Sequence, residues 1–498
     1  MSATAQLLIG DLFRRNARVV PGRVAASLAS TAITHAALDE AANRIAWAVR
    51  DLGVEAGDRV LGWADTSLEV LALFAGLAKR GAVFAPLDAR LGPDEALPTA
   101  RLARPQLLVA DPAHRDGAAA IASALGVRCV PLGRLAGGAE PDALLRPGAR
   151  SDDFAAAGLR EGDPHAIFFT SGSTGRPKGV VLSHRANYLR SFHGVFRDAP
   201  EVSVCMFPLY HMAGFTLALS AWQTRGEIAL VESATAEAIL DAVERRRASR
   251  LYCIPSIWSR ILAIDTSRWD TATLRELDTG TSAVPLELIR ALKQRFPETV
   301  TRIYYGSTEA GSVATLSDCD VLRKPGSVGA PSPGVEIALG EDGEIRVRSA
   351  YLMDGYFDDP EATTVALRGG WYHTGDLGEL DGEGHLAIAG RVKDVIRTGG
   401  ESVAPAEVEA ALRLHPAVAE VAVVGVADPQ WGEVVCAVVV PAAGAAPTLA
   451  DLQECCEGRL AGFKKPRRLA LVDALPRTPA TGQIQRTLLV QQLAARSV

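Results

Sequence analysis

Helical and strand patterns alternate over two long stretches of this chain. Residues 58–63 and 82–87 are short apolar runs typical of buried strands, and the helical pattern of residues 67–79 lies between them. The same alternation returns in residues 227–231, 237–247, 250–254 and 286–296. A strand–helix–strand order of this kind predicts a parallel sheet covered by helices, and therefore an α/β fold.

The pattern changes from about residue 334 onward. Three segments alternate apolar and polar side chains and are joined by Gly-Asp turns, which is typical of antiparallel strands; they are residues 335–339, 344–349 and 385–389. A small αβ unit follows, with a helix at 405–414 and strands at 418–424 and 433–440. We expect a large body of βαβ-rich sheets with a β-rich subdomain, followed by a small C-terminal α+β lobe.

Composition and charge exclude several classes of protein. The 498 residues are 48% apolar, which is enough for a large core, and the net charge of −6 offers no basic surface for nucleic acid or anionic lipid. The first five residues lack a basic segment, so we expect no secretory signal, and the longest apolar stretch, 434–445, is too short to span a bilayer. Seven cysteines without Cys-x-x-Cys spacing predict free thiols and a cytoplasmic location.

A glycine-rich loop with four hydroxyls follows the apolar run 166–169. It reads Thr-Ser-Gly-Ser-Thr-Gly-Arg-Pro-Lys-Gly at residues 170–179. Glycines let the backbone approach an anion closely, while Arg176 and Lys178 supply positive charge, so the loop could hold phosphate groups. It does not fit G-x-x-x-x-G-K-[ST], so the mechanism of P-loop NTPases is not predicted. A polar turn beyond a strand is the alternative, because Ser, Gly and Pro are common turn residues.

Four further motifs follow in order along the chain. They are Tyr-Tyr-Gly-Ser-Thr-Glu at 304–309, Tyr-His-Thr-Gly-Asp at 372–376, Gly-Arg-Val-Lys-Asp at 390–394 and Arg-Thr-Gly-Gly-Glu-Ser-Val-Ala-Pro at 397–405. With the hydroxyl loop, the series resembles the adenylate-forming superfamily of acyl-CoA synthetases, luciferases and peptide-synthetase adenylation domains. The resemblance covers nearly the whole chain and is greatest to bacterial fatty-acyl or aryl-CoA ligases.

The resemblance implies an ATP and Mg²⁺ site. The residues expected at the β- and γ-phosphates are Thr170, Ser171, Gly172, Ser173, Thr174, Gly175 and Lys178. The residues expected around the adenine are Tyr304, Tyr305 and Gly306, together with Gly280, Thr281 and Ser282, which also border the acid. Thr308 would contact the α-phosphate, Glu309 would bind Mg²⁺ as a hard oxygen ligand, and Asp376 with Arg391 would bind the ribose.

The resemblance also implies where the carboxylic acid binds. His211 lies in the loop expected beside the reacting carboxyl, although a lone histidine often has a structural role, and both interpretations stay open. Trp258, Met212 and Phe215 could line an apolar acyl pocket or belong to the core.

A second set of residues would serve coenzyme A, the thiol co-substrate. Relatives form an acyl-adenylate first, and a small domain then rotates about a hinge before the thiol attacks. This implies an adenylation domain at 1–390, a hinge at 391–394 centred on Lys393, and a lid domain at 395–498. Gly399, Gly400 and Glu401 would line the pantetheine tunnel in the second pose.

The end of the chain departs from the family pattern. Residues 476–486 match a segment in which most relatives have a lysine that bridges carboxylate and α-phosphate, and here Gln483 occupies that position. Glutamine keeps a donor but loses the charge. The substitution could be engineered, could mark a natural variant with a weak first step that uses Lys464 or Lys465, or could reflect a different acceptor or donor.

We predict an ATP- and Mg²⁺-dependent acid–thiol ligase, an acyl- or aryl-CoA synthetase that acts as a monomer or homodimer. The alternatives are delivery of the adenylate to a carrier-protein thiol or an amine, and an adenylation-impaired protein. An oxidoreductase is excluded because the Gly-x-Gly-x-x-Ala of residues 382–387 precedes no helix. The chain contains no G-x-S-x-G motif, as a serine hydrolase would need, and no His/Cys cluster with zinc spacing.

Overall fold

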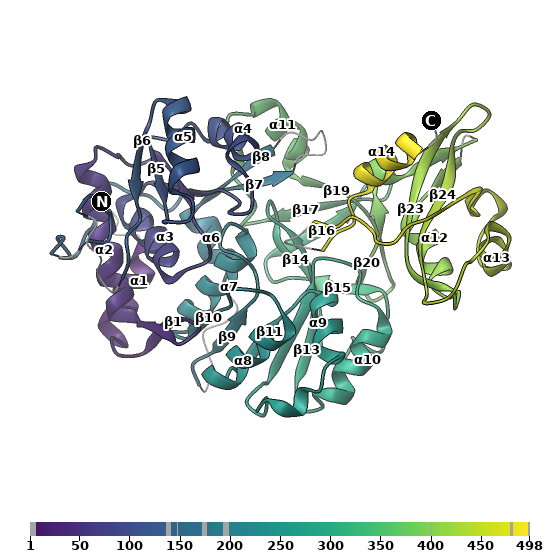
Figure 1. The fold of residues 1–498 in the computed structure, drawn as a ribbon, viewed down its shortest axis with the longest axis horizontal. Coiled ribbons are helices and arrows are strands. Elements are labelled where there is room, and N and C mark those ends of the chain that lie inside the picture. Colours follow the sequence, from purple (N-terminus) through teal and green to yellow (C-terminus); the bar gives the residue numbers. More distant parts are fainter. Residues whose placement is uncertain are drawn as a thin grey trace.

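The computed structural model describes residues 6–135, 141–146, 148–171, 177–192, 199–399, 401–478 and 482–496. Three sheets of 13, 7 and 5 strands organise this part of the chain. Figure 1 shows a large body that holds the first two sheets and a smaller lobe, in light green and yellow, that holds the third. The predicted α/β fold, with a large N-terminal domain of mixed sheets and a small C-terminal α+β domain, is confirmed.

The 13-stranded sheet runs in the order β16-β17-β19-β20-β15-β14-β13-β12-β11-β9-β10-β1-β2. Its parallel part consists of β1 (Val24–Leu28), β9 (Val202–Cys205), β10 (Glu227–Leu230), β11 (Arg250–Tyr252), β12 (Glu276–Gly280) and β13 (Val300–Ser307). The intervening helices are α7 (Met212–Gln223), α8 (Ala236–Arg246), α9 (Pro255–Leu262), η1 (Thr266–Arg268) and α10 (Leu286–Arg295). At the edge, β2 (Thr31–Thr34) pairs antiparallel to β1.

The other end of this sheet is antiparallel, as the change of pattern near residue 334 predicts. Its strands are β14 (Gly311–Leu316), β15 (Ser327–Pro331), β16 (Val335–Leu339), β17 (Glu344–Ser349), β19 (Tyr372–Leu380) and β20 (Leu386–Arg391). This antiparallel part lies next to the small lobe in Figure 1, and β20 leads directly into it.

The seven-stranded sheet contains the hairpin of the hydroxyl loop. Its order is β18 (Gly355–Tyr356), β8 (Pro177–Ser183), β7 (Pro164–Ser171), β4 (Val83–Pro86), β3 (Arg59–Trp63), β5 (Leu107–Ala110) and β6 (Arg128–Pro131). The helices of this region are α1 (Ile9–Val19), α2 (His35–Asp51), α3 (Leu68–Arg80), α4 (Pro93–Ala103), α5 (Arg115–Leu125), α6 (His184–Arg190), α11 (Pro360–Ala366) and η2 (Arg368–Gly370).

Helix α3 is buried almost all round because its sequence, Leu-Glu-Val-Leu-Ala-Leu-Phe-Ala-Gly-Leu-Ala-Lys-Arg, is apolar on every face. Phe74 stacks on Phe215 of α7 with ring centroids 4.3 Å apart, so one core cluster joins the two sheets. Gly76 lets α2 and α3 approach closely, since a Cβ there would lie 2.7 Å from Cβ of Ile45. The two sheets of the large body therefore share one hydrophobic core.

The small lobe is built on a five-stranded sheet. Its strands are β21 (Ile396–Thr398), β22 (Glu401–Val403), β23 (Val418–Asp428), β24 (Gly432–Pro441) and β25 (Arg468–Leu471). Its helices are η3 (Val392–Asp394), α12 (Pro405–Leu412), α13 (Leu449–Cys455), η4 (Gly462–Lys464) and α14 (Arg486–Arg496). Strand β23 is almost entirely apolar because Val421 and Val423 face one hydrophobic cluster while Ala422 and Val424 face another.

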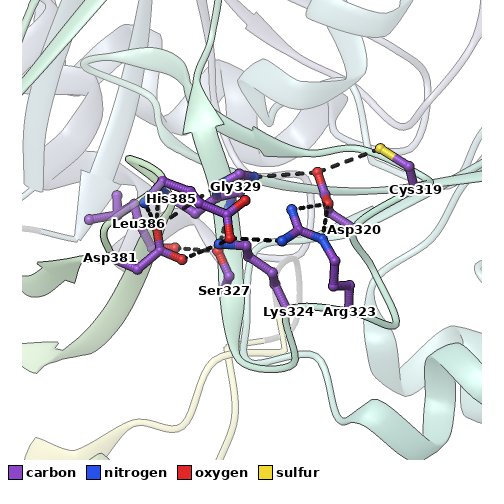
Figure 2. Close-up of polar contacts among 10 residues, drawn as sticks. Cys319, Asp320, Arg323, Lys324, Ser327, Gly329, Asp381, His385 and Leu386 are labelled. Carbon is purple, nitrogen blue, oxygen red and sulfur yellow. Dashed lines mark hydrogen bonds and ion pairs between the residues drawn. The ribbon is translucent and has the colours of Figure 1, made fainter.

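A charged cluster braces the hairpin that ends in the inter-lobe connection. Figure 2 shows Arg323 and Lys324, from the segment between β14 and β15, directed at the turn between β19 and β20. Lys324 forms ion pairs with Asp381 (2.5 Å) and Glu383 (2.8 Å), and Arg323 pairs with Glu383 (2.8 Å). We call these four residues the hairpin brace. Its cations and carboxylates neutralise one another, so it ties β20 to the body.

Two further predictions concern location and redox state. Within the described ranges, no helix combines the length and the apolar character that crossing a bilayer requires. All seven cysteines are free thiols, as predicted, and Cys205, Cys253, Cys436 and Cys456 are buried.

Candidate active site

The carboxyl ends of four parallel strands, β9, β11, β12 and β13, meet at one edge of the large sheet, where ligands bind in folds of this type. Gly280 ends β12 and pairs with Tyr304 of β13. A Cβ at Gly280 would lie 2.2 Å from the carbonyl oxygen of Tyr304 and 2.8 Å from the hydroxyl of Tyr252. Only glycine therefore fits there, and Thr281 follows with a φ of 68°.

Three predicted residues come together on one side of this edge. The Tyr305 hydroxyl donates to Oδ2 of Asp376 (2.7 Å), and Nε of Arg391 lies 3.1 Å from Oδ1 of the same carboxylate. Asp376 and Arg391 are directly opposite in the β19–β20 ladder. Burial raises the pKa of Asp376, and the positive charge of Arg391 opposes that shift. The result is a fixed carboxylate that can accept hydrogen bonds from hydroxyl groups.

The hydroxyl loop joins β7 and β8, with Thr170 opposite Lys178 in the ladder. The predicted phosphate-binding residues Gly172, Ser173, Thr174 and Gly175, and the side chain of Ser171, lie outside the described part of the structure. Nζ of Lys178 lies 4.5 Å from the ring centroid of Tyr356, a cation–π contact. The hydroxyl of Tyr356 donates to Oε1 of Glu309 (3.1 Å). Lys178 and Glu309 therefore flank one tyrosine.

Arg190, which sequence reasoning missed, fixes the backbone of the predicted Thr308 and Glu309 pair. Its buried guanidinium donates to the carbonyl oxygens of Thr308 (2.8 Å), Glu309 (3.5 Å) and Tyr351 (2.6 Å). Burial lowers the pKa of Arg190 to about 10, so the side chain remains positive at neutral pH. No local pattern marks Arg190 because its partners lie more than a hundred residues away in sequence.

Glu309 is suited to hold a hard divalent cation. One of its oxygens accepts from Tyr356, and the other has no partner among the described residues. A carboxylate of this kind fits Mg²⁺, which commonly binds proteins through one or two carboxylates. A second acidic group, Asp65, Asp111 and His114, does not fit as well. Both ring nitrogens of His114 are engaged, on Asp111 (2.7 Å) and on the carbonyl of Ala89 (2.8 Å).

His211 caps the N-terminus of α7 and lies beside Phe207 after the end of β9. Its Nδ1 accepts a hydrogen bond from the backbone N–H of Ala213 (3.2 Å), so the proton of the neutral ring is on Nε2. Burial, with a smaller effect of Arg90, lowers the pKa of His211 to about 4 and keeps the ring neutral at pH 7. The Nε2–H has no acceptor among the described residues and can donate to a bound oxygen. The structural role of His211 is therefore present, and its Nε2–H is left over for another partner.

The three residues considered for an acyl pocket lie in the core. Phe215 stacks on Phe74, Met212 is 9% exposed, and Nε1 of Trp258 donates to the carbonyl of Asp278 (3.1 Å). A different set of rings lies at the strand ends instead.

These rings form a row that sequence reasoning identified only in part. Phe207 lies 5.9 Å from His211 and 5.3 Å from Tyr252, and Tyr252 lies 6.0 Å from Tyr304, all between ring centroids. We call these four residues the aromatic row. Phe207 and Tyr252 were missed, although Tyr252 ends β11 and Phe207 lies two residues after the end of β9, beside strands that supply predicted site residues.

Gln483 brings the small lobe to the strand ends. Its side-chain amide donates to the carbonyl oxygen of Thr281 (3.1 Å), and a Cβ at the adjacent Gly482 would lie 3.3 Å from Ile254. Ser282, next to Thr281, is exposed. Lys464 and Lys465, considered as substitutes for the missing lysine, form ion pairs with Glu407 and Glu457 within the small lobe.

The predicted hinge and tunnel residues lie in the connection and on the small lobe. Lys393 is exposed in η3, between β20 and β21. Gly399 has a φ of 60°, and a Cβ there would lie 2.6 Å from the Trp431 ring. Glu401 is exposed, and Gly400 lies outside the described residues.

Family models match most of the chain in two blocks. The model described as AMP-binding enzyme matches residues 13–357, and that described as AMP-binding enzyme C-terminal domain matches residues 407–481. Fold and site thus define an adenylate-forming ligase.

The chain belongs to the AMP-binding enzyme family, as the motif series predicted. It is 35% identical to the indoleacetate–CoA ligase of Aromatoleum aromaticum, over 98% of each chain. It is 36% identical to a feruloyl-CoA synthase of an Amycolatopsis species, over 94% of this chain and 96% of that one. The crystal structure of ATP-bound MatB from Rhodopseudomonas palustris superposes with a TM-score of 0.87 at 32% identity, over 97% of this chain and 98% of the other.

Proposed function

We propose that this enzyme activates an aromatic carboxylic acid with ATP and transfers the acyl group to coenzyme A. The aromatic row carries the proposal, because the half-buried rings of Tyr252 and Tyr304 at the strand ends offer stacking surfaces to an aryl group, while the buried Phe207 packs against Tyr252. The CoA ligases named above, which act on indoleacetate and ferulate, support both the aromatic acid and the thiol acceptor.

In the first step a carboxylate oxygen attacks the α-phosphate and pyrophosphate leaves. Asp376 and Arg391 would orient the ribose while Tyr305 packs on the adenine, and Lys178 with the hydroxyl loop would bind the phosphates. Glu309 would hold Mg²⁺, whose charge offsets the negative charge of the phosphates when it is bound. Arg190 keeps Thr308 and Glu309 in place.

His211 and Gln483 would act at the reacting carboxyl. The Nε2–H of His211 donates to a carboxyl oxygen, which orients the acid without adding a charge. Gln483, at the Thr281 carbonyl, supplies an amide donor where most relatives supply a charged lysine. After adenylation the small lobe would rotate about Lys393 and bring Gly399, Gly400 and Glu401 to the acyl group, so that a thiol can attack.

Gln483 favours a second candidate function, which is an enzyme of the same family whose first step, adenylate formation, is impaired. Losing a charge-assisted contact to the transition state costs about 3 kcal/mol, or about a hundredfold in rate. An enzyme that delivers the acyl group to a carrier-protein thiol or to an amine would use the same site for its first step. Only the acceptor distinguishes such an enzyme from a CoA ligase.

The test is a panel of acids incubated with ATP and Mg²⁺, with pyrophosphate release as the first readout. Benzoate, phenylacetate, cinnamate and indoleacetate are compared with acetate, malonate and octanoate. Mass spectrometry then identifies the product with CoA, with a carrier protein and with an amine. We expect aryl-CoA thioesters, and turnover of the aliphatic acids alone would contradict the proposal.

A further inference from the structure

The hydroxyl of Tyr252 is a polar group without a partner at the candidate acid site. Tyr252 ends β11, and its ring lies between Phe207 and Tyr304 in the aromatic row. Its hydroxyl reaches over Gly280, as the 2.8 Å approach to a Cβ there shows. None of the residues that the structure describes forms a hydrogen bond with it.

Other tyrosine hydroxyls around the site are satisfied within the protein. Tyr305 donates to Asp376 (2.7 Å), Tyr356 to Glu309 (3.1 Å) and Tyr351 to the carbonyl of Ser312 (3.0 Å). Tyr304 shares the unpartnered state of Tyr252, but it already has a place beside the nucleotide. The Tyr252 side chain is half-buried and its hydroxyl remains accessible at the strand ends, so a bound group can accept the hydrogen bond that the protein leaves unused.

The surroundings of this hydroxyl indicate what it can bind. Burial, and then the negative charge of Asp278, raise the pKa of Tyr252 above its ordinary value, so the group stays a neutral donor at any working pH. The half-buried ring of Tyr304 continues the row on one side, the buried Phe207 packs against Tyr252 on the other, and glycine at position 280 keeps the space beside the hydroxyl free of a side chain. The position thus combines aromatic walls with one donor.

We propose that the Tyr252 hydroxyl donates a hydrogen bond to an oxygen substituent on the acyl group, so that the enzyme selects ring-oxygenated aromatic acids over the same acids without the oxygen. The inference rests on the proposed function, whose acid site it refines. A hydrogen bond to a substrate oxygen discriminates more strongly than an apolar pocket does, because the bare analogue leaves the protein donor unpaired.

The test compares Tyr252→Phe with the unchanged protein on matched acids. Benzoate, phenylacetate and cinnamate are each paired with their 3- and 4-hydroxy and 3- and 4-methoxy derivatives. For the unchanged protein we expect kcat/KM of at least one oxygenated acid to exceed that of its parent by about tenfold or more. Tyr252→Phe should reduce that ratio about tenfold, because the oxygenated acid loses its donor and the parent acid no longer leaves that donor unpaired, and the KM for ATP should change by less than about twofold.

Tyr188→Phe is the matched control. It removes the same atom from a partly buried tyrosine on α6, outside the residues assigned to the site, and should leave every ratio unchanged. Thermal melting of each variant shows that the fold is intact. Calorimetric binding of the same acids, with a non-hydrolysable ATP analogue present, gives the ratios again without turnover.

The outcomes separate the two proposals. Equal losses for oxygenated and parent acids, a raised KM for ATP, or no preference in the unchanged protein would overturn the role of Tyr252 while the aromatic acid ligase stands. If no aromatic acid either reacts or binds, the proposed function fails and this inference fails with it.

Discussion

At the residue scale, Gln483 and Arg190 each hold backbone carbonyl groups of the candidate site, one with a neutral amide and the other with a positive charge. Gln483 reaches the Thr281 carbonyl from the small lobe with a neutral amide. Arg190 lies inside the body and supplies a buried charge to three backbone carbonyls. A positive charge at position 483 would strengthen the contact to a phosphate, whereas a neutral side chain at position 190 could not replace the charge of Arg190.

Gln483→Lys should increase the rate of the first step, adenylate formation. An ammonium group at this position would offset negative charge that builds on the α-phosphate, which is worth about 3 kcal/mol or about a hundredfold in rate. The measurement is acid-dependent exchange of labelled pyrophosphate into ATP. Gln483→Met, which is similar in length but has no donor, is the control and should not exceed the rate of the unchanged protein. An unchanged rate in Gln483→Lys would mean that Gln483 does not occupy the position of the family's lysine.

Arg190→Met should destabilise the body and slow pyrophosphate release. Methionine fills part of the space but leaves the carbonyls of Thr308 and Tyr351 without their donor, at a cost of about 2–4 kcal/mol. Urea unfolding gives the free energy and the exchange assay gives the rate. Arg185→Met is the control, since Arg185 is an exposed arginine on the same helix whose ion pair with Glu161 spans 3.7 Å. Equal effects of the two substitutions would show that Arg190 has no special role.

At the scale of elements, the β19–β20 ladder aligns Asp376 with Arg391, and the hairpin brace ties the far end of the same hairpin to the body. The ladder fixes which charges meet, because the two residues share one register position. The same hairpin thus carries the candidate ribose site and the start of the inter-lobe connection.

Asp376→Asn should weaken ATP binding more than it slows turnover. The amide cannot accept two hydroxyl donors and pair with Arg391 as a carboxylate does, and a charge-assisted hydrogen bond is about twice as strong as a neutral one. We expect kcat/KM for ATP to fall by about 10- to 100-fold. Glu379→Gln removes a charge from an exposed position on the same strand and should have little effect. A fall in kcat with an unchanged KM would argue against a ribose contact.

The elements themselves follow closely from local patterns. The helix expected at 67–79 is α3 (Leu68–Arg80), and the strands expected at 335–339 and 344–349 match β16 and β17 residue for residue. Periodicity and flanking glycines suffice to predict these elements, because the buried faces of each segment leave a regular apolar pattern in the sequence. Strand order is different: β13 pairs with β12 and β14, but β1 pairs with β10 across two hundred residues, and no local pattern encodes that.

The candidate site shows the same division. The resemblance located Tyr305, Asp376 and Gln483 from short motifs, and the structure brings the first two within 2.7 Å. Arg190 and Tyr252 belong to no motif. Arg190 matters because it binds carbonyl groups more than a hundred residues away, and Tyr252 because its hydroxyl lies over Gly280 of another strand. Contacts between distant segments decide such positions.

At the scale of the whole molecule, four histidines of the described ranges are held neutral by their surroundings. They are His35, His165, His184 and His211. Burial lowers the pKa of His35, His184 and His211 to about 4 each, and Nε2 of His35, His165 and His184 has no hydrogen-bond partner within the described ranges. The first three lie at the start of α2, in β7 and at the start of α6, so all of them belong to the large body.

Stability should therefore fall as the pH drops from 6.5 toward 4. The unfolded chain binds these protons near pH 6.5 while the folded chain resists them until about pH 4, so the stabilisation is complete above pH 6.5 and is lost below it. At pH 5 each such histidine costs about 2 kcal/mol. Urea midpoints at pH 7.5, 6 and 5 measure the loss. His184→Gln should reduce the slope between pH 7.5 and 5, because it removes one buried titrating ring, whereas His415→Gln, on the small lobe, should leave it unchanged. Equal slopes in both variants would show that buried histidines do not set the acid limit.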